Sequence, residues 1–496
     1  MKKATKVFYI TFALVILTVV FGVAAPEIFE AATGNIRSFI NTAFGWYYLV
    51  IMAVMLILVF VIIVSPYGKI RLGKDRDRPE FSTITWLAML FSAGMGIGLV
   101  FYGASEPLSH FAVQPATAEP GTDAAFKESL QRTYFHWGIH VWAMYGIIAL
   151  SLAFFQFRKG EPALISSTLK PLFGDRMNGP LGTLVDILAV FATVFGVATS
   201  LGFGAAQING GISYLFGVPQ TDWMQLVIIG VVTLLFIISA WSGLNKGIKY
   251  LSNTNLVLAV TLLLLVLILG PTLLILNMYT ETFGAYIQNL ISLSFQSAPL
   301  DAENRSWLDG WTIFYWAWWI SWAPFVSMFI ARVSKGRTIR EFLIGVVLAP
   351  TVFGSLWFAA FGTTAIDIQK SGVDLTALPI DQTLFGMFNE LPGGMILSII
   401  AILLVSTFFI TSADSATFVL GMQSTNGSLL PSNQIKILWG VAQSLVAGIL
   451  LWVGGLDAVQ NTIIVAALPF SFIMILMVVA LFKALNTELA SMKSKK

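Results

Sequence analysis

Residues 315–332, YWAWWISWAPFVSMFIAR, decide which fold and function this chain is expected to have. The segment is apolar, and four of its aromatic residues stand at i, i+3, i+4 and i+7, so on a helix they share one face. These residues are Tyr315, Trp318, Trp319 and Trp322. Pro324 follows and is expected to interrupt the helix, because proline lacks a backbone N–H. Two interpretations are open: a belt of rings at the membrane interface, or a box for a cation that cannot donate hydrogen bonds, such as a quaternary ammonium.

The composition excludes a water-soluble globule. Of the 496 residues, 57% are hydrophobic and 11% are charged, as in a protein that crosses the membrane many times. The sequence has no cysteine, which excludes disulfide scaffolds, cysteine metal sites and thiol catalysis. Its histidines are His110, His136 and His140, so an all-histidine metal site would need all of them.

Apolar windows of about 20 residues predict an all-α protein with twelve transmembrane helices. The windows lie near 7–27, 46–65, 83–104, 132–157, 182–216, 224–241, 252–276, 308–331, 342–366, 395–424, 434–453 and 458–482. The first follows the basic start MKKATK, is long enough to span and ends at no clean cleavage site, so we predict a retained helix rather than a signal peptide.

Lysine and arginine predict which loops face the cytoplasm. With a cytoplasmic N-terminus, 23 of the 28 basic residues fall on the cytoplasmic side and five on the outer side. The outer five are Arg37, Lys127, Arg132, Arg305 and Lys370. Both termini are therefore predicted to be cytoplasmic, and the net charge of +3 reflects membrane orientation rather than binding to nucleic acid.

Two segments outside the spans are informative. Residues 280–296 are amphipathic and too short to span, which predicts a helix along the outer surface. Residues 337–350 begin charged and continue apolar, so they either start span nine or form a separate surface helix that bends into it.

Span three, FSAGMGIGLVFYGASEP, contains glycines that destabilise a helix by about 1 kcal/mol each relative to alanine. The stretch from Gly94 to Gly98 is therefore predicted to be unwound. Close helix packing by small residues is one explanation. The other is a transporter's discontinuous helix, whose carbonyls bind a cation and whose half-helix N-terminus faces an anionic substrate group. A dinucleotide loop is excluded because no βαβ context surrounds these glycines.

Spans three to seven and eight to twelve are predicted to be inverted repeats, because the two sets of five begin on opposite sides and both opening helices carry an interruption. Two extra helices precede them. The predicted division is 1–65 (two N-terminal helices), 66–279 (first repeat), 280–306 (outer surface helix and loop), 307–484 (second repeat) and 485–496 (short cytoplasmic tail).

A second aromatic cluster lies in span four, FHWGIHVWAMY. On a helical wheel Trp137, Trp142 and Tyr145 fall within about 140° of one another, so they can line one side of a cavity. Trp142 and Tyr145 sit near the middle of the span, which argues against an interfacial belt.

Ionisable residues at membrane depth are functional candidates because a carboxylate there needs a partner or water. Asp414 is either functional or a hydrogen-bond anchor among neighbouring hydroxyl groups. For Asp186 and Glu106 a structural role is favoured.

These patterns together resemble the betaine/choline/carnitine transporter family. The likeness rests on GMGIG at 94–98, HW-x-x-H-x-W-x-x-Y at 136–145, WAWWISWAPF followed by ARVSKGRTIREF at 316–342, and STFFITSADSAT at 406–417. It extends over the whole membrane domain, and within the family it is greatest with the bacterial sodium-coupled glycine betaine carriers. The resemblance implies a LeuT-like fold.

The resemblance also implies a set of site residues. The substrate box would comprise Trp137, Trp142, Tyr145, Trp318, Trp319 and Trp322, with the backbone at Gly94, Met95 and Gly96. The principal sodium site would use backbone oxygens of Ser92, Met95 and Phe408 and the hydroxyls of Thr411 and Ser412. Alternatively, those two hydroxyls bond back to the preceding helical turn. A second sodium site would use Thr193 and the position of Phe325, but Val197 stands where coupled carriers have a hydroxyl, so the number of sodium ions stays open. Gating or structural candidates are Asp414 and Arg332.

The implied function is import of a quaternary-ammonium compatible solute, glycine betaine first, by sodium symport and alternating access for osmoprotection. The setting would be a bacterial cell membrane, with sodium as coupling ion, no further cofactor, no enzymatic activity and a homotrimer by resemblance alone. A sodium-independent carnitine or betaine exchanger and a choline importer are the alternatives within the family. A channel or a membrane enzyme is less consistent with the sequence, which shows no ring of charges, no repeated filter sequence and no catalytic constellation.

Overall fold

The apolar windows of the sequence form helices in the computed structural model, which describes residues 4–94, 96–241 and 245–494, with 91–94, 239–241 and 245–249 described by their backbone alone. Over these residues the regular structure is helical, apart from an isolated antiparallel bridge between Arg71 and Thr338. The α-helices are α1 (Lys6–Ala24), α2 (Pro26–Val64), α3 (Thr83–Gly94), α4 (Ile97–Leu108), α5 (Asp123–Trp137), α6 (Ile139–Ala153), α7 (Lys170–Phe173), α8 (Pro180–Phe216), α9 (Asp222–Trp241), α10 (Asn245–Leu269), α11 (Thr272–Gln288), α12 (Leu290–Phe295), α13 (Ala302–Gly310), α14 (Thr312–Val333), α15 (Ile339–Lys370), α16 (Thr383–Asn389), α17 (Gly394–Gln423) and α18 (Asn433–Ser494). Short 3₁₀ and π-helical segments are η1 (Pro66–Lys69), η2 (Ser109–Val113), η3 (Phe154–Arg158), η4 (Ser166–Leu169), η5 (Gly174–Asn178) and η6 (Leu375–Ala377).

Nine helical stretches among the described residues are long and apolar enough to cross a membrane. The last of them, α18, carries two of the predicted spans, because Gly454 and Gly455 leave the helical conformation between them. The third predicted span is divided between α3 and α4, which have 12 residues each. The all-helical membrane fold agrees with the sequence, and the count of twelve stays a prediction.

Some helices begin or end at a proline or glycine that lies outside the limits of the predicted windows or inside them. The second helix begins at Pro26, because proline is favoured in the first turn of a helix. It is 39 residues long and therefore begins well before the predicted window at 46–65. The seventh helix, α10, ends at Leu269 because Gly270 and Pro271 follow it. The surface helix expected at 280–296 therefore begins earlier, at the start of α11.

The segment at 337–350 belongs to span nine. Helix α15 runs unbroken for 32 residues, through Pro350, and includes most of this segment. The side chain of Thr338 accepts a hydrogen bond from the backbone N–H of Glu341 (3.3 Å), which is the N-terminal half of a capping box. A separate surface helix is therefore excluded.

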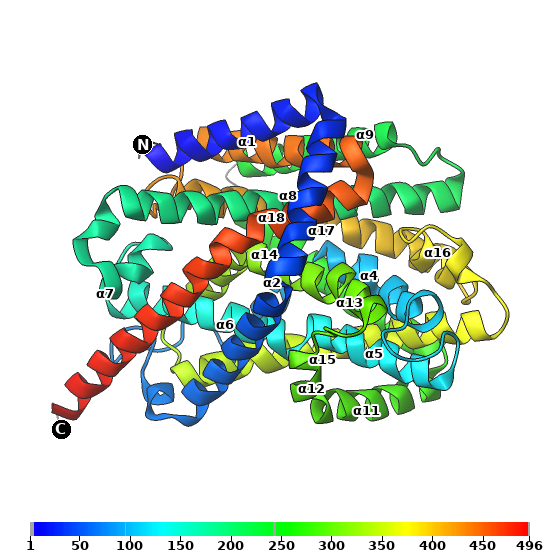
Figure 1. Cartoon of the computed structure of the whole chain (residues 1–496), viewed down its shortest axis with the longest axis horizontal. Coiled ribbons are helices and arrows are strands. Elements are labelled where there is room, and N and C mark those ends of the chain that lie inside the picture. Colours follow the sequence, from blue (N-terminus) through cyan, green and yellow to red (C-terminus); the bar gives the residue numbers. More distant parts are fainter. Residues whose placement is uncertain (1–3, 95, 242–244, 495–496) are drawn as a thin grey trace.

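The two ends of the chain lie at the same end of the molecule, on the left of Figure 1. There, Arg158 at the end of η3 bonds to Glu488 near the end of α18 (2.7 Å), and Leu72 pairs through its backbone N–H with Arg337 O (2.8 Å). Helix α18 packs along α8, α9 and α2, and α14 packs against α6 and α8. This arrangement places α14, which carries the aromatic residues, inside the helical assembly.

Candidate functional site

The third span is interrupted within the predicted glycine stretch. Helix α3 ends at Gly94, and α4 begins at Ile97 after Gly96, whose backbone is extended (φ −132°, ψ −155°). Met95 lies outside the described residues, as do the side chains of Ser92 and Gly94. The interruption is shorter than predicted, because the helix resumes before Gly98.

Aromatic rings from two other helices lie against this interruption. A Cβ atom added at Gly98 would lie 2.7 Å from Trp318 Cη2 and 2.9 Å from Trp137 Cη2, and Cβ atoms in proteins almost never come this close to another heavy atom. A Cβ at Gly96 would lie 3.8 Å from Trp322 Cη2. Glycine is therefore required at 98 for the start of α4 to reach the rings.

The expected interruption of span eight at Pro324 is wrong. Helix α14 continues through Pro324 to Val333, and the break lies before the aromatic residues, at Trp311 between α13 and α14. Proline removes one intrahelical hydrogen bond, but a buried transmembrane helix can tolerate this because neighbouring helices hold it in place. All four aromatic residues of the opening segment therefore lie on one uninterrupted helix.

Span four has an interruption that the sequence analysis missed. Helix α5 ends at Trp137, Gly138 is non-helical (φ −100°, ψ −134°), and α6 begins at Ile139. The helical wheel that grouped Trp137 with the later rings assumed one continuous helix, and that geometry is wrong. Trp142 instead donates through Nε1 to the carbonyl of Trp137 (3.2 Å).

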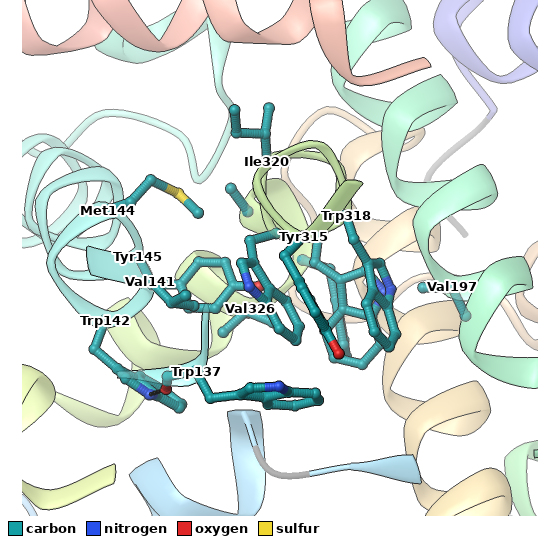
Figure 2. Packing of buried hydrophobic residues seen from close by; sticks show 14 of the residues in the cluster. Trp137, Val141, Trp142, Met144, Tyr145, Val197, Tyr315, Trp318, Ile320 and Val326 are labelled. Carbon is teal, nitrogen blue, oxygen red and sulfur yellow. Dashed lines mark hydrogen bonds between the residues drawn. The ribbon is translucent and has the colours of Figure 1, made fainter. Parts of the chain in front are cut away.

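Four rings from α5 and α14 form a continuous group, here called the ring cluster, and Figure 2 shows three of them gathered together. The ring cluster consists of Trp137, Tyr315, Trp318 and Trp319. The centroids of Trp318 and Trp319 are 4.8 Å apart with nearly parallel planes (10°), and Trp137 meets Trp319 edge to face at 4.8 Å. Tyr315 was not among the box residues implied by the resemblance.

The remaining predicted rings take part in two other ring pairs. Trp142 and Tyr145 pair with each other at 5.8 Å, and Trp322 pairs with Phe325 at 5.6 Å. All six rings implied by the resemblance are at most 7% exposed. A belt at the membrane interface would leave them exposed to lipid, so their burial argues against that interpretation.

Polar ring atoms are fixed by specific acceptors. Trp319 Nε1 donates to His136 O (2.9 Å), and Trp322 Nε1 donates to Gly196 O (2.6 Å). Trp318 Nε1 and the Tyr145 hydroxyl are buried and have no hydrogen-bond partner among the described residues. Buried polar atoms are normally paired, so these two donors are available to a ligand.

The sequence analysis favoured a structural role for Glu106 but did not identify its partners. Its side chain is fully buried, and Oε2 accepts from Trp137 Nε1 (2.7 Å) and from the Tyr315 hydroxyl (2.5 Å). Oε1 lies 2.7 Å from His136 Nδ1 and 3.4 Å from His110 Nε2. The only sequence signal was a carboxylate in an apolar span four residues before a histidine.

Glu106, His110 and His136 present ligand atoms within 4.8 Å of one another, close enough to be considered as a metal site. The donor set fits a metal poorly, because His136 Nδ1 lies at hydrogen-bond distance from Glu106 Oε1 (2.7 Å) and Glu106 Oε2 accepts from Trp137 and Tyr315. This group is better described as a hydrogen-bonded anchor for the ring cluster.

The predicted sodium ligands of α17 divide into two kinds. Thr411 Oγ1 bonds back to Thr407 O (3.0 Å) and Phe408 O (3.2 Å), as the alternative interpretation expected, and accepts from Asn255 Nδ2 (2.9 Å). Ser412 Oγ lies 3.9 Å from the position of a Cβ at Gly96, next to the interruption of span three.

The other candidates have structural contacts. Thr193 Oγ1 bonds back to Ala189 O (2.8 Å). Val197 follows one turn later in α8 and is buried. Arg332 places its guanidinium 5.1 Å from the ring of Phe418, and Asp414 is buried. Asp186 accepts hydrogen bonds from the backbone N–H and the hydroxyl of Ser166, which agrees with the structural role expected of it.

Comparison with known proteins gives consistent matches. A profile described as BCCT, betaine/carnitine/choline family transporter, matches residues 6–490. The glycine betaine transporter OpuD of Bacillus subtilis (strain 168) is 54% identical over 494 residues, covering 99% of this chain and 96% of that protein. A probable glycine betaine transporter of Desulfitobacterium hafniense (strain Y51) is 45% identical, and the ectoine/hydroxyectoine transporter of Virgibacillus pantothenticus is 41% identical, each over 98% of both chains.

A solved structure, the substrate-bound outward-open state of a Na⁺-coupled sialic acid symporter, is similar with a TM-score of 0.51 at 15% identity. The match covers 88% of this chain and 87% of that chain. At this identity the likeness shows a shared fold only, of the LeuT type expected from the sequence, while the division into inverted repeats stays a prediction.

Proposed function

Because the chain belongs to the betaine/carnitine/choline transporter family, we propose that it imports glycine betaine, or a closely related quaternary-ammonium solute, by sodium symport. The protein is a multi-pass bacterial membrane transporter and not an enzyme. Glycine betaine carries a permanent positive charge that cannot donate hydrogen bonds and a carboxylate at the other end. A site for it therefore needs aromatic faces and hydrogen-bond donors close together.

The contact between the first turn of α4 and the ring cluster carries the proposal. Gly98 lies against Trp318 and Trp137, so the N-terminal end of a helix inside the membrane adjoins two indole rings. The first N–H groups of a helix lack intrahelical partners and carry a partial positive charge, which suits a carboxylate. The π-faces suit a trimethylammonium group, with a contribution of roughly 0.5 to 2 kcal/mol per ring.

The unpaired donors support the same assignment. Trp318 Nε1 and the Tyr145 hydroxyl are buried without a partner among the described residues, and each could donate to a carboxylate oxygen. We propose that Trp142 and Trp322 complete the box with Trp137 and Trp319. The remaining proposed backbone contacts come from Gly94, Met95 and Gly96.

Sodium coupling is proposed from the position of Ser412. Its hydroxyl lies near Gly96, where interrupted backbone can provide carbonyl oxygens, and sodium as a hard cation prefers oxygen ligands. Ser92, Met95, Phe408 and Thr411 are proposed as the other ligands. A site that joins α17 to the interruption would couple sodium to the substrate, and each ligand would raise the affinity of the other by the same factor.

The proposed second sodium site at Thr193 and Phe325 has less support, because the Thr193 hydroxyl already bonds within its own helix. Cytoplasmic termini are proposed from the distribution of basic residues, and the common location of both chain ends is consistent with them (Figure 1). A homotrimer rests on the family resemblance alone.

Uptake of radiolabelled solute into proteoliposomes tests the proposal. The panel is glycine betaine, choline, carnitine, proline betaine and ectoine, each with an inward sodium gradient and with potassium replacing sodium. We expect glycine betaine to accumulate in the sodium gradient alone. Equal uptake in potassium would overturn the symport and favour an exchanger, and accumulation of ectoine without betaine would overturn the quaternary-ammonium substrate.

A further inference from the structure

A buried carboxylate joins two rings of the ring cluster that come from different helices. Glu106 on α4 accepts at the same oxygen, Oε2, from the indole of Trp137 on α5 (2.7 Å) and from the phenol of Tyr315 on α14 (2.5 Å). The tryptophan N–H can only donate, so Oε2 is an acceptor in this arrangement. Both rings are therefore polarised by the same carboxylate.

The groups around Glu106 leave a negative charge on Oε2, the carboxylate oxygen that accepts from Trp137 and Tyr315. His136 faces Oε1 through Nδ1, and its Nε2 is 2.9 Å from the Thr312 hydroxyl, which fits a neutral ring that donates to Glu106 and accepts from Thr312. His110 faces the same oxygen at 3.4 Å. The nearest guanidinium, Arg132, is paired with Glu128 (3.2 Å) and lies over the ring of Trp307.

Holding the rings in place does not by itself require a charge. A neutral side chain of the same shape, such as glutamine, offers a carbonyl oxygen that could accept the same donors. An ionisable group buried at membrane depth is costly, so its presence calls for a function that depends on charge. Donation of an N–H or O–H to a carboxylate increases electron density in the ring, and cation–π attraction depends on the negative potential of the ring face.

We propose that Glu106 is a specificity-determining residue, which acts through Trp137 and Tyr315 to make the site prefer a positively charged group over an uncharged group of the same shape. This inference rests on the proposed function, because it assumes that the substrate carries a quaternary ammonium. Glu106 does not need to touch the substrate. Its effect would be electronic, passed through one hydrogen bond to Trp137, which belongs to the proposed box, and through a second to Tyr315, which stacks on the box residues Trp318 and Trp319.

A pair of isosteric ligands separates charge from shape. Glycine betaine and 3,3-dimethylbutyrate have the same carboxylate and the same three methyl groups, and differ in having nitrogen or carbon at the centre. We would measure equilibrium binding of both to purified wild-type protein and to Glu106→Gln, Glu106→Asp and Tyr315→Phe. The control is Glu281→Gln, which neutralises an exposed carboxylate that is paired with Lys127.

We expect the wild-type protein, Glu106→Asp and Glu281→Gln to prefer the charged ligand. In Glu106→Gln the ratio of the two affinities should fall by roughly five- to tenfold, which corresponds to losing part of the cation–π attraction of two rings. Tyr315→Phe should lower the ratio by a smaller factor and gives an independent test if Glu106→Gln does not fold.

Three outcomes would contradict the inference or its premise. If Glu106→Gln weakens both ligands by the same factor, the carboxylate has a structural role and the inference is overturned, while the proposed function stands. If the ratio is unchanged in both Glu106→Gln and Tyr315→Phe, the inference is overturned in the same way. If the wild-type protein binds glycine betaine no better than 3,3-dimethylbutyrate, the proposed function fails, and the inference fails with it.

Discussion

The approach of α4 to the ring cluster can be tested by adding a single methyl group. In Gly98→Ala the new Cβ would lie 2.7 Å from Trp318 Cη2 and 2.9 Å from Trp137 Cη2. Carbon atoms pack comfortably at about 3.5 Å or more, so the rings would have to move by roughly 0.6 to 0.8 Å. Overpacking of this kind costs about 1 to 3 kcal/mol, offset by up to about 1 kcal/mol from the better helix propensity of alanine.

The main effect should appear in binding rather than in stability. Displacing two rings that contribute roughly 0.5 to 2 kcal/mol each should weaken glycine betaine binding at least about fivefold. The assays are equilibrium binding of radiolabelled betaine to the purified protein and thermal unfolding in detergent. The matched control is Gly230→Ala on α9, where no heavy atom of the described residues lies within 4 Å of an added Cβ. That variant should bind like the wild type. Wild-type affinity in a folded Gly98→Ala protein would refute the proposed location of the site.

Other substitutions test separate parts of the site and of the fold. Trp319→Ala should weaken betaine binding about two- to thirtyfold, since it removes one cation–π face; unchanged affinity would exclude that ring from the site. Thr411→Ala combined with Ser412→Ala should raise the sodium concentration for half-maximal uptake severalfold, and an unaltered sodium dependence would remove this cation site. Burial raises the pKa of Asp381, in the loop before α16, to about 6 although Gln220 donates a hydrogen bond to it. The folded protein therefore binds that proton more tightly than the unfolded chain does. As a result, the contribution of Asp381 to the free energy of unfolding falls as the pH rises from about 4 to about 6. On going from about pH 7 to about pH 5 the wild type should gain about 1 kcal/mol of unfolding free energy relative to Asp381→Asn, measured by thermal unfolding at both pH values, and an identical pH dependence would contradict this assignment.

The sequence predicted features whose causes are local. The glycine stretch of span three predicted an interruption, because glycine weakens a helix wherever it stands. The spacing of Trp318 and Trp319 predicted a shared face, which the uninterrupted α14 provides. Burial of these rings was not determined by spacing, since the same pattern fits a belt at the membrane interface.

The features that sequence analysis missed depend on partners far away in the chain. The interruption at Gly138 contains one glycine, and a Cβ there would lie 2.4 Å from Tyr134 O and 2.8 Å from the hydroxyl of Tyr286 on α11. Pro324 was predicted to interrupt its helix, but α14 continues through it, because a buried helix held by its neighbours can tolerate a proline. The role of Glu106 depends on donors 31 and 209 residues later in the chain, which no local pattern indicates.

The two interrupted helices suggest how a zwitterion would be oriented. Helices α4 and α6 both start close to the rings, and the first N–H groups of each helix are potential anion ligands. The N–H of Ile139, at the start of α6, donates to the Tyr286 hydroxyl (3.0 Å), so this helix start is already capped by the protein. The start of α4 contacts the indoles through Gly98 instead. A carboxylate would therefore be held at α4, and the ammonium group would extend from it toward the ring faces. In this orientation Glu106, eight residues after Gly98 on α4 and therefore about 12 Å further along the helix, is separated from the helix start that would hold the carboxylate, and it acts on the rings through its hydrogen bonds to Trp137 and Tyr315.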